Sequence, residues 1–174
     1  MTWRRLLAIA GLLGILGLWV FSDRLFPLEI LSGPNVRVRD GDTLELRFAG
    51  GVETIRLTGI DAPEYHQTCR TAANVEWPCG RAARAQLEAL ALVKPLSCTV
   101  EARDQYHRKV STCATPATPD IGGAMVASGL AISPDERGTA RYAAEQDAAR
   151  GAHRGLWQGA FQPPAEWRAA HPRS

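Results

Sequence analysis

Two runs of alternating apolar and polar residues, 43–48 and 52–57, meet at the Gly50-Gly51 pair. Alternation with a period of two is typical of a strand with one buried face, and glycines between two such runs predict a hairpin. A shorter alternating run at 36–38 precedes them, across an Asp-Gly-Asp turn. The chain is therefore restricted to folds that contain an antiparallel sheet with one apolar side.

A helix, a second hairpin and two more helices follow this sheet. Small and apolar residues recur at helical spacing over 80–93, and residues 98–101 and 109–113 form the arms of the second hairpin. Helices are predicted at 120–128, where Asp120 is the candidate N-cap, and at 139–150. This order predicts an α+β domain whose curled antiparallel sheet could close into a small barrel.

The length of 174 residues suits one domain with its own core. We expect a hydrophobic segment and linker at 1–32, the folded domain at 33–160 and an irregular, proline-containing tail at 161–174. The net charge is only +2, so bulk charge makes no case for a nucleic-acid partner. Evidence for a nucleic-acid partner would have to come from a local site.

An unbroken apolar run occupies residues 6–21, directly after Arg4 and Arg5. It is long for the hydrophobic part of a signal peptide and short for a spanning helix. The preceding arginines predict a cytoplasmic N-terminus and an exported remainder. We expect an uncleaved helix that anchors the domain on the periplasmic or extracellular side of a membrane. Cleavage at Ser22 is the alternative, and it would produce a secreted protein.

All four cysteines lie in the part expected to be exported, which predicts two disulfides in an oxidising compartment. Cys69 and Cys79 bracket a short loop rich in turn formers, while Cys98 and Cys113 lie on the two arms of the second hairpin. These positions favour the pairs Cys69–Cys79 and Cys98–Cys113, and other connectivities remain open. A zinc site is disfavoured because no C-x-x-C pair occurs.

Three carboxylates and two guanidinium groups stand out in the domain: Asp42, Arg56, Asp61, Glu64 and Arg108. Carboxylates bind hard metal ions, a further acid can take a proton from water, and guanidinium groups bind phosphate in a bidentate manner. Taken alone, the D-G-D-T and D-A-P-E motifs are turn and loop signatures. Together with the two arginines they form a set suited to the cleavage of phosphodiesters.

The motifs that carry these residues resemble those of the staphylococcal, or thermonuclease-like, nuclease family. The resemblance runs from about residue 36 to residue 157 and rests on V-R-D-G-D-T, R-L-T-G-I-D-A-P-E, D-Q-Y-H-R, M-V-A-S-G-L-A and G-L-W. It implies a five-stranded antiparallel β-barrel of the OB type with about three helices. It also implies a calcium-dependent phosphodiesterase that acts on DNA and RNA.

The resemblance assigns a metal site to Asp42, Asp61 and the backbone carbonyl of Ala62. Oxygen ligands of this kind suit Ca²⁺, and Mg²⁺ or Mn²⁺ could replace it. Asp40 is a further candidate that would bind through water, with capping of the turn as its alternative role. The family usually has threonine in place of Ala62, but a carbonyl ligand survives that change.

Glu64 is similar to the family residue that orients or deprotonates the attacking water, and Arg56 and Arg108 to those that bind the phosphate as it gains charge. Tyr106 resembles a position near the phosphate, and its alternative role is to cover the barrel mouth. The chain departs from the family at His107, where glycine is common. Its segment 132–141 is short and lacks an aromatic residue, which predicts weak base stacking.

The expected function is therefore that of an exported, membrane-anchored and calcium-dependent nuclease that acts as a monomer on DNA, RNA or both. Two alternatives from other classes remain. The first is a non-catalytic binding module that keeps the nuclease-like barrel. The second is a disulfide-locked scaffold in the cell envelope.

Overall fold

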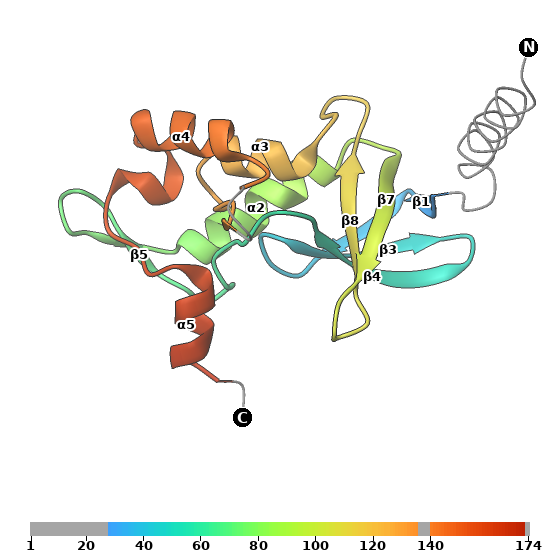
Figure 1. Cartoon of the computed structure of the whole chain (residues 1–174), viewed down its shortest axis with the longest axis horizontal. Coiled ribbons are helices and arrows are strands. Elements are labelled where there is room, and N and C mark those ends of the chain that lie inside the picture. Colours follow the sequence, from blue (N-terminus) through green and yellow to red (C-terminus); the bar gives the residue numbers. More distant parts are fainter. Residues whose placement is uncertain (1–27, 136–139, 173–174) are drawn as a thin grey trace, which may run out of the picture.

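The computed structural model describes residues 28–135 and 140–172, which form a six-stranded sheet, a two-stranded sheet and four α-helices (Figure 1). The large sheet has the order β1-β7-β8-β4-β3-β2. Its strands are β1 (Ile30–Gly33), β2 (Asn35–Val38), β3 (Thr43–Phe48), β4 (Gly51–Leu57), β7 (Leu96–Arg103) and β8 (Lys109–Ala114). The remaining elements are β5 (Cys69–Arg70), β6 (Glu76–Trp77), α2 (Cys79–Ala91), α3 (Ile121–Ala127), α4 (Ala143–Gly151), the 3-10 helix η1 (Gly155–Gln158) and α5 (Pro164–Ala170).

The two edge strands of the large sheet are consecutive in the chain. β1 pairs with β7 and β2 pairs with β3, and only Pro34 separates β1 from β2. Proline lacks an N–H group and interrupts a strand ladder, so one extended segment is divided into two strands at this point. The sheet therefore curls until its two edges meet through Pro34.

The observed sheet differs from the predicted five-stranded antiparallel one in two respects. β1 is a sixth strand, and three of its four residues lie in the segment 1–32 that we expected to be anchor and linker. β4 and β8 run parallel, with Ile55 opposite Lys109. A parallel pair requires a crossover connection, and α2 and β7 lie between these two strands in the chain. The mixed α+β class is as predicted.

Alternation along β3 and β4 builds the core. β3 buries Leu44 and Leu46, and β4 buries Ile55 and Leu57. α2 and α3 pack against the sheet and against each other, and α4 packs on α3 (Figure 1). The helices complete the core with apolar side chains that are fully buried: Ala83, Leu87, Ile121, Met125 and Val126.

Three of the predicted helices are present with shifted ends, as α2, α3 and α4. The predicted cap of α3 is confirmed, because the carboxylate of Asp120 accepts a hydrogen bond from the Gly123 N–H at 3.0 Å. This bond satisfies one of the N–H groups that the first turn of a helix leaves without a partner. The predicted start of the last of them, at residue 139, lies outside the described residues.

The tail that we expected to be irregular contains the helix α5, which extends away from the other helices in Figure 1. Its first residue is Pro164, and proline suits the first helical turn because its missing N–H would have no partner there. Proline residues therefore begin this helix rather than prevent it.

Both expected disulfides are present. Cys69–Cys79 joins β5 to the first residue of α2, and Cys98–Cys113 joins directly paired residues of β7 and β8. The predicted N-terminal hydrophobic helix lies outside the described residues. Within residues 28–135 and 140–172, no helix combines the length and apolar character that crossing a bilayer would need.

Candidate active site

The carboxylate of Asp42 is buried at the end of the turn between β2 and β3. Its Oδ1 accepts hydrogen bonds from Thr43 Oγ1 at 2.8 Å and from Arg56 Nη1 at 2.6 Å, and its Oδ2 accepts from the Ala62 N–H at 3.0 Å. The backbone carbonyl of Asp42 also accepts from the Leu57 N–H. The turn is thus fastened to the end of β4, which carries Arg56.

Glycine in the Asp-Gly-Asp turn is explained by close packing. A Cβ atom on Gly41 would lie 2.6 Å from the Cβ of Ala62 and 2.7 Å from that of Ala83. The turn therefore packs directly on the loop that carries Asp61 and on α2. Asp40 performs the capping role considered above, since its Oδ1 accepts from the Asp42 N–H at 3.1 Å.

Arg56 bridges the two aspartates that were predicted to bind metal. Its Nη1 lies 2.6 Å from Asp42 and its Nη2 lies 3.0 Å from Asp61 Oδ1. Asp61 is held in place by two backbone hydrogen bonds of 2.9 Å to Ile132. Strand β4 and this bridge therefore fix the positions of Asp42 and Asp61 relative to Arg56, from which they are 14 and 5 residues away in the chain.

Burial and charge act in opposite directions at this cluster. Burial raises the pKa of Asp42 to about 6, and the neighbouring Arg56 opposes the rise. Burial also disfavours the charge on Arg56, but Asp42 and Asp61 outweigh it and raise the pKa of the guanidinium. Arg56 is therefore always protonated, whereas Asp42 gains its full charge only above pH 6.

A second guanidinium reaches Asp61 from the C-terminal helix. Nη1 and Nη2 of Arg168 lie 2.9 Å and 3.1 Å from Oδ1 and Oδ2 of Asp61, and Nη1 lies 3.4 Å from Oε1 of Glu64. Arg168 and Asp61 are 107 residues apart. Sequence reasoning did not identify Arg168, because it belongs to no motif and lies within the segment 161–174 that was expected to be irregular.

Arg108 is brought to the same cluster through Thr43. Its Nη1 lies 3.5 Å from the Thr43 hydroxyl, which itself donates to Asp42, while its Nε donates to Asp104 at 2.7 Å. The preceding His107 has a φ of 61°, a left-handed conformation that explains why glycine suits this position. Tyr106 is 69% exposed at the tip of the hairpin, where its ring lies 5.4 Å from the Arg108 guanidinium.

The oxygen donors fit a hard divalent cation. Asp42 and Asp61 supply carboxylates and Ala62 follows Asp61 directly, so its carbonyl is a candidate third ligand. Across residues 28–135 and 140–172 there is no cluster of three or more His, Cys, Asp or Glu side chains placed to hold a metal. A cation here would therefore depend on two carboxylates, backbone oxygen and water, and it would have to share Asp42 and Asp61 with the guanidinium groups.

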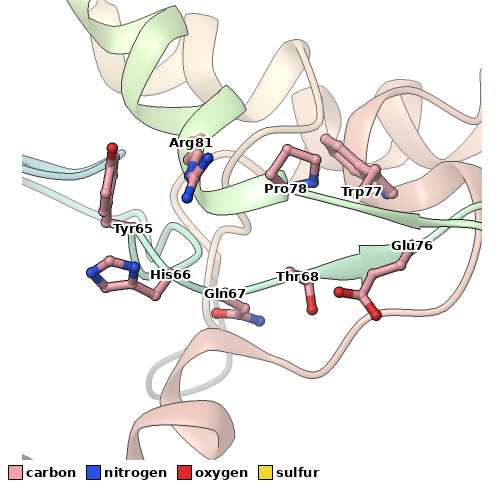
Figure 2. Close-up of a pocket in the computed structure, with 8 residues that line it drawn as sticks. All are labelled: Tyr65, His66, Gln67, Thr68, Glu76, Trp77, Pro78 and Arg81. Atoms are coloured by element: carbon pink, nitrogen blue, oxygen red, sulfur yellow. The ribbon is translucent and has the colours of Figure 1, made fainter.

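A cavity of about 250 Å³ lies beside the loop that carries Glu64. Figure 2 shows Tyr65 and His66 at one end of it, Glu76 and Trp77 at the other, and Arg81 on α2 above. The ring of Tyr65 lies within cation–π distance of Arg81 and of Arg84, at 5.7 and 5.2 Å.

Gln67 fastens this loop to the C-terminal segment. Its buried side chain accepts from the Glu64 N–H at 3.2 Å and donates to the Gln162 carbonyl at 2.7 Å. The disulfide Cys69–Cys79 holds the other side of the loop. Gly80 also packs closely on the Glu64 carbonyl, since a Cβ atom on Gly80 would lie only 1.8 Å from that oxygen.

Comparisons with known proteins show which family the chain resembles. A model of the family described as "Staphylococcal nuclease homologue" matches residues 54–159. An "Uncharacterized endonuclease" of Escherichia coli O157:H7 is 32% identical over 153 residues, which cover 87% of this chain and 93% of that protein, and one of the same description from Escherichia coli matches equally. "Probable endonuclease LCL3" of Schizophyllum commune is 32% identical over 132 residues, 66% of this chain and 44% of that protein.

The matched segment contains Arg56, Asp61, Glu64 and Arg108, while Asp42 lies before it and Arg168 after it. The segment thus includes both predicted phosphate-binding arginines and two of the three acids. By this match, and by its similarity to the bacterial proteins over most of its length, the chain belongs to the staphylococcal nuclease homologue family.

Proposed function

We propose that the protein is a nuclease that hydrolyses phosphodiester bonds of DNA or RNA with the help of a divalent cation, which we take to be Ca²⁺. The observation that carries this proposal is the bridge of Arg56 between Asp42 and Asp61, with Arg108 joined to the same cluster through Thr43. The relatives named endonuclease support it.

Each side chain has a role in this proposal. Asp42, Asp61 and the Ala62 carbonyl would hold the cation, which supplies positive charge to the phosphate when bound. Glu64 accepts a proton from the attacking water as the water oxygen bonds to phosphorus and the bond from phosphorus to the leaving oxygen breaks. Arg56 and Arg108 donate hydrogen bonds to phosphate oxygens that gain charge in the transition state.

The surface beside Glu64 provides room for the rest of the substrate. The aromatic side chains of Tyr65 and Trp77 line the cavity, and Arg81 adds a positive charge beside them (Figure 2). Aromatic stacking and nearby arginine side chains are the usual means of binding single strands. We infer that nucleotides next to the scissile phosphate contact this surface.

DNA cleavage by the full chain, purified in detergent, tests the proposal. We expect cleavage in Ca²⁺ that stops in the presence of a chelator and is lost in Asp42→Ala and Arg108→Ala. Glu64→Gln should slow turnover by about 10²- to 10⁴-fold and leave Ca²⁺ affinity nearly unchanged. Glu88→Gln, on the exposed side of α2, is the matched control. Binding of DNA without cleavage would favour a binding module, and neither binding nor cleavage would favour a scaffold.

The apolar run at residues 6–21 motivates two further proposals, which are anchoring in a membrane and export of the domain. We also propose that the protein acts as a monomer. Protease added outside intact cells or spheroplasts should reach the domain while it remains attached to the membrane. A domain that stays protected until the membrane is lysed would contradict export. A domain released in soluble form and starting near residue 22 would favour cleavage.

A further inference from the structure

A third guanidinium group contacts the acid cluster from outside the matched family segment. Arg168 donates to both carboxylate oxygens of Asp61 and approaches Glu64. The following inference rests on the proposed function and adds a ligand for its substrate.

The contacts of Arg168 occupy the oxygens that a cation would need. Oδ1 of Asp61 accepts from Arg56 and from Arg168, and Oδ2 accepts from Arg168. A divalent cation at Asp61 therefore competes directly with Arg168. The cation carries twice the charge of a guanidinium, so Coulomb attraction favours the cation at equal distance.

Release from Asp61 would leave the Arg168 guanidinium available to bind another anion. Asp42, Asp61 and Glu64 carry three negative charges and Arg56 and Arg168 two positive ones, so this set has one net negative charge. A bound divalent cation changes the net charge to one positive. A phosphodiester carries one negative charge, and its oxygens fit the guanidinium fork as a carboxylate does.

Helix α5 is suited to such an exchange. Its start is held by the hydrogen bond between Gln67 and the Gln162 carbonyl and by the buried Pro164, while residues 169–172 are exposed. The side chain of Arg168 lies one turn beyond this anchor and is 38% exposed, against 21% for Arg56. A change of partner therefore requires a movement of one long side chain near the C-terminal end of a short helix.

We propose that Arg168 leaves Asp61 for the substrate phosphodiester when a divalent cation binds, and so serves as a third phosphate-binding arginine beside Arg56 and Arg108. In the cation-free protein the Arg168 guanidinium forms ion pairs with both Asp61 and Glu64.

Calorimetry on the full chain in detergent tests the exchange. Two affinities are measured, one for Ca²⁺ alone and one for phosphorothioate-linked dithymidylate, a hydrolysis-resistant diester, at saturating Ca²⁺. In Arg168→Gln, Ca²⁺ should bind severalfold more tightly because its competitor is gone. The diester should bind about 10- to 100-fold more weakly, as expected for the loss of a charged hydrogen-bond donor.

Two further variants control for charge and geometry. Arg168→Lys keeps the charge without the bidentate fork and should restore only part of the diester affinity. Arg150→Gln removes an exposed arginine from α4 and should change neither affinity.

Three patterns would overturn the exchange. Weaker binding of both ligands to Arg168→Gln would indicate a clamp that only maintains the site. Tighter Ca²⁺ binding with unchanged diester binding would indicate a competitor that never contacts substrate, and two unchanged affinities would indicate no role. If the wild-type chain cleaves DNA, any of these patterns refutes the exchange of Arg168 but leaves the proposed nuclease function standing. If the wild-type chain binds neither ligand and does not cleave, the proposed function fails with it.

Discussion

Arg56 and Arg168 both donate to Oδ1 of Asp61, but they reach it from very different parts of the molecule. Arg56 stands on β4, in the middle of the large sheet, and is bonded to two aspartates. Arg168 stands on a seven-residue helix at the C-terminus and is more exposed. The sheet therefore holds the Arg56 guanidinium in one position, whereas the Arg168 guanidinium on its short helix can move away from Asp61.

Removal of the sheet-bound guanidinium should have the largest effect. Arg56→Gln takes away one donor to the transition state and should lower kcat by about 10²- to 10³-fold, the range for loss of a single charge-stabilising donor. Single-turnover cleavage of DNA in saturating Ca²⁺ measures it. Arg168→Gln, examined under the same conditions at saturating substrate, should lose less. Equal losses would erase the distinction between the two arginines.

The titration of Asp42 provides a second way to probe the Arg56 side of the cluster. Burial raises the pKa of Asp42 from 3.8 to about 6, which corresponds to about 3 kcal/mol. Because the pKa is higher in the folded state, the contribution of Asp42 to stability is full below about pH 4 and is lost as the pH rises through 6. Urea unfolding of cation-free protein at pH 4 and pH 7 should show this loss in the wild type and a smaller one in Asp42→Asn. The same pH dependence in both proteins would contradict the assignment.

The attachment of α5 can be loosened without a change in either arginine. Gln67→Ala removes a buried amide that bonds the Gln162 carbonyl and the Glu64 N–H, at an expected cost of about 1–3 kcal/mol. Amide hydrogen exchange should accelerate in residues 165–171 and stay slow in β4. Gln105→Ala, at the exposed tip of the second hairpin, serves as the control. Unchanged exchange in α5 would show that other contacts hold the helix.

Loss of Arg168 should have the smallest effect on stability. Its ion pairs are partly exposed, so Arg168→Gln should change the free energy of unfolding by no more than about 1 kcal/mol. Arg56→Gln leaves two largely buried carboxylates without their shared partner and should cost more. Urea unfolding of both variants at pH 7 in chelator makes the comparison. A larger loss for Arg168→Gln would mean that α5 is an integral part of the fold.

Much of the sheet and of the central site could be predicted because the relevant signals are local. The alternation in 43–48 and 52–57 predicts a hairpin, and the hairpin places Arg56 beside Asp42. Asp120 was recognised as a cap because its bond to Gly123 spans one helical turn. Asp61 follows β4 after a short loop, so its approach to Arg56 also depends on few residues.

Other features depend on contacts between distant parts of the chain. β1 could not be separated from the linker, because four residues that pair with β7 leave only a short apolar pattern. The parallel pairing of β4 with β8 depends on how the chain crosses over through α2 and β7. Neither arrangement has a local preference that would reveal it.

The amino-acid sequence by itself determined the strands β2, β3, β4, β7 and β8, the helices α2, α3 and α4, the favoured cysteine pairs and the identity of five charged side chains. Each of these depends on spacing within one or two neighbouring elements. Tertiary structure alone decided that the tail would return as a helix and bring Arg168 to Asp61 across 107 residues. A lone arginine in a tail can pair with any exposed acid. Only the packing of residues 160–164 on the loop of Gln67 selects which one it meets.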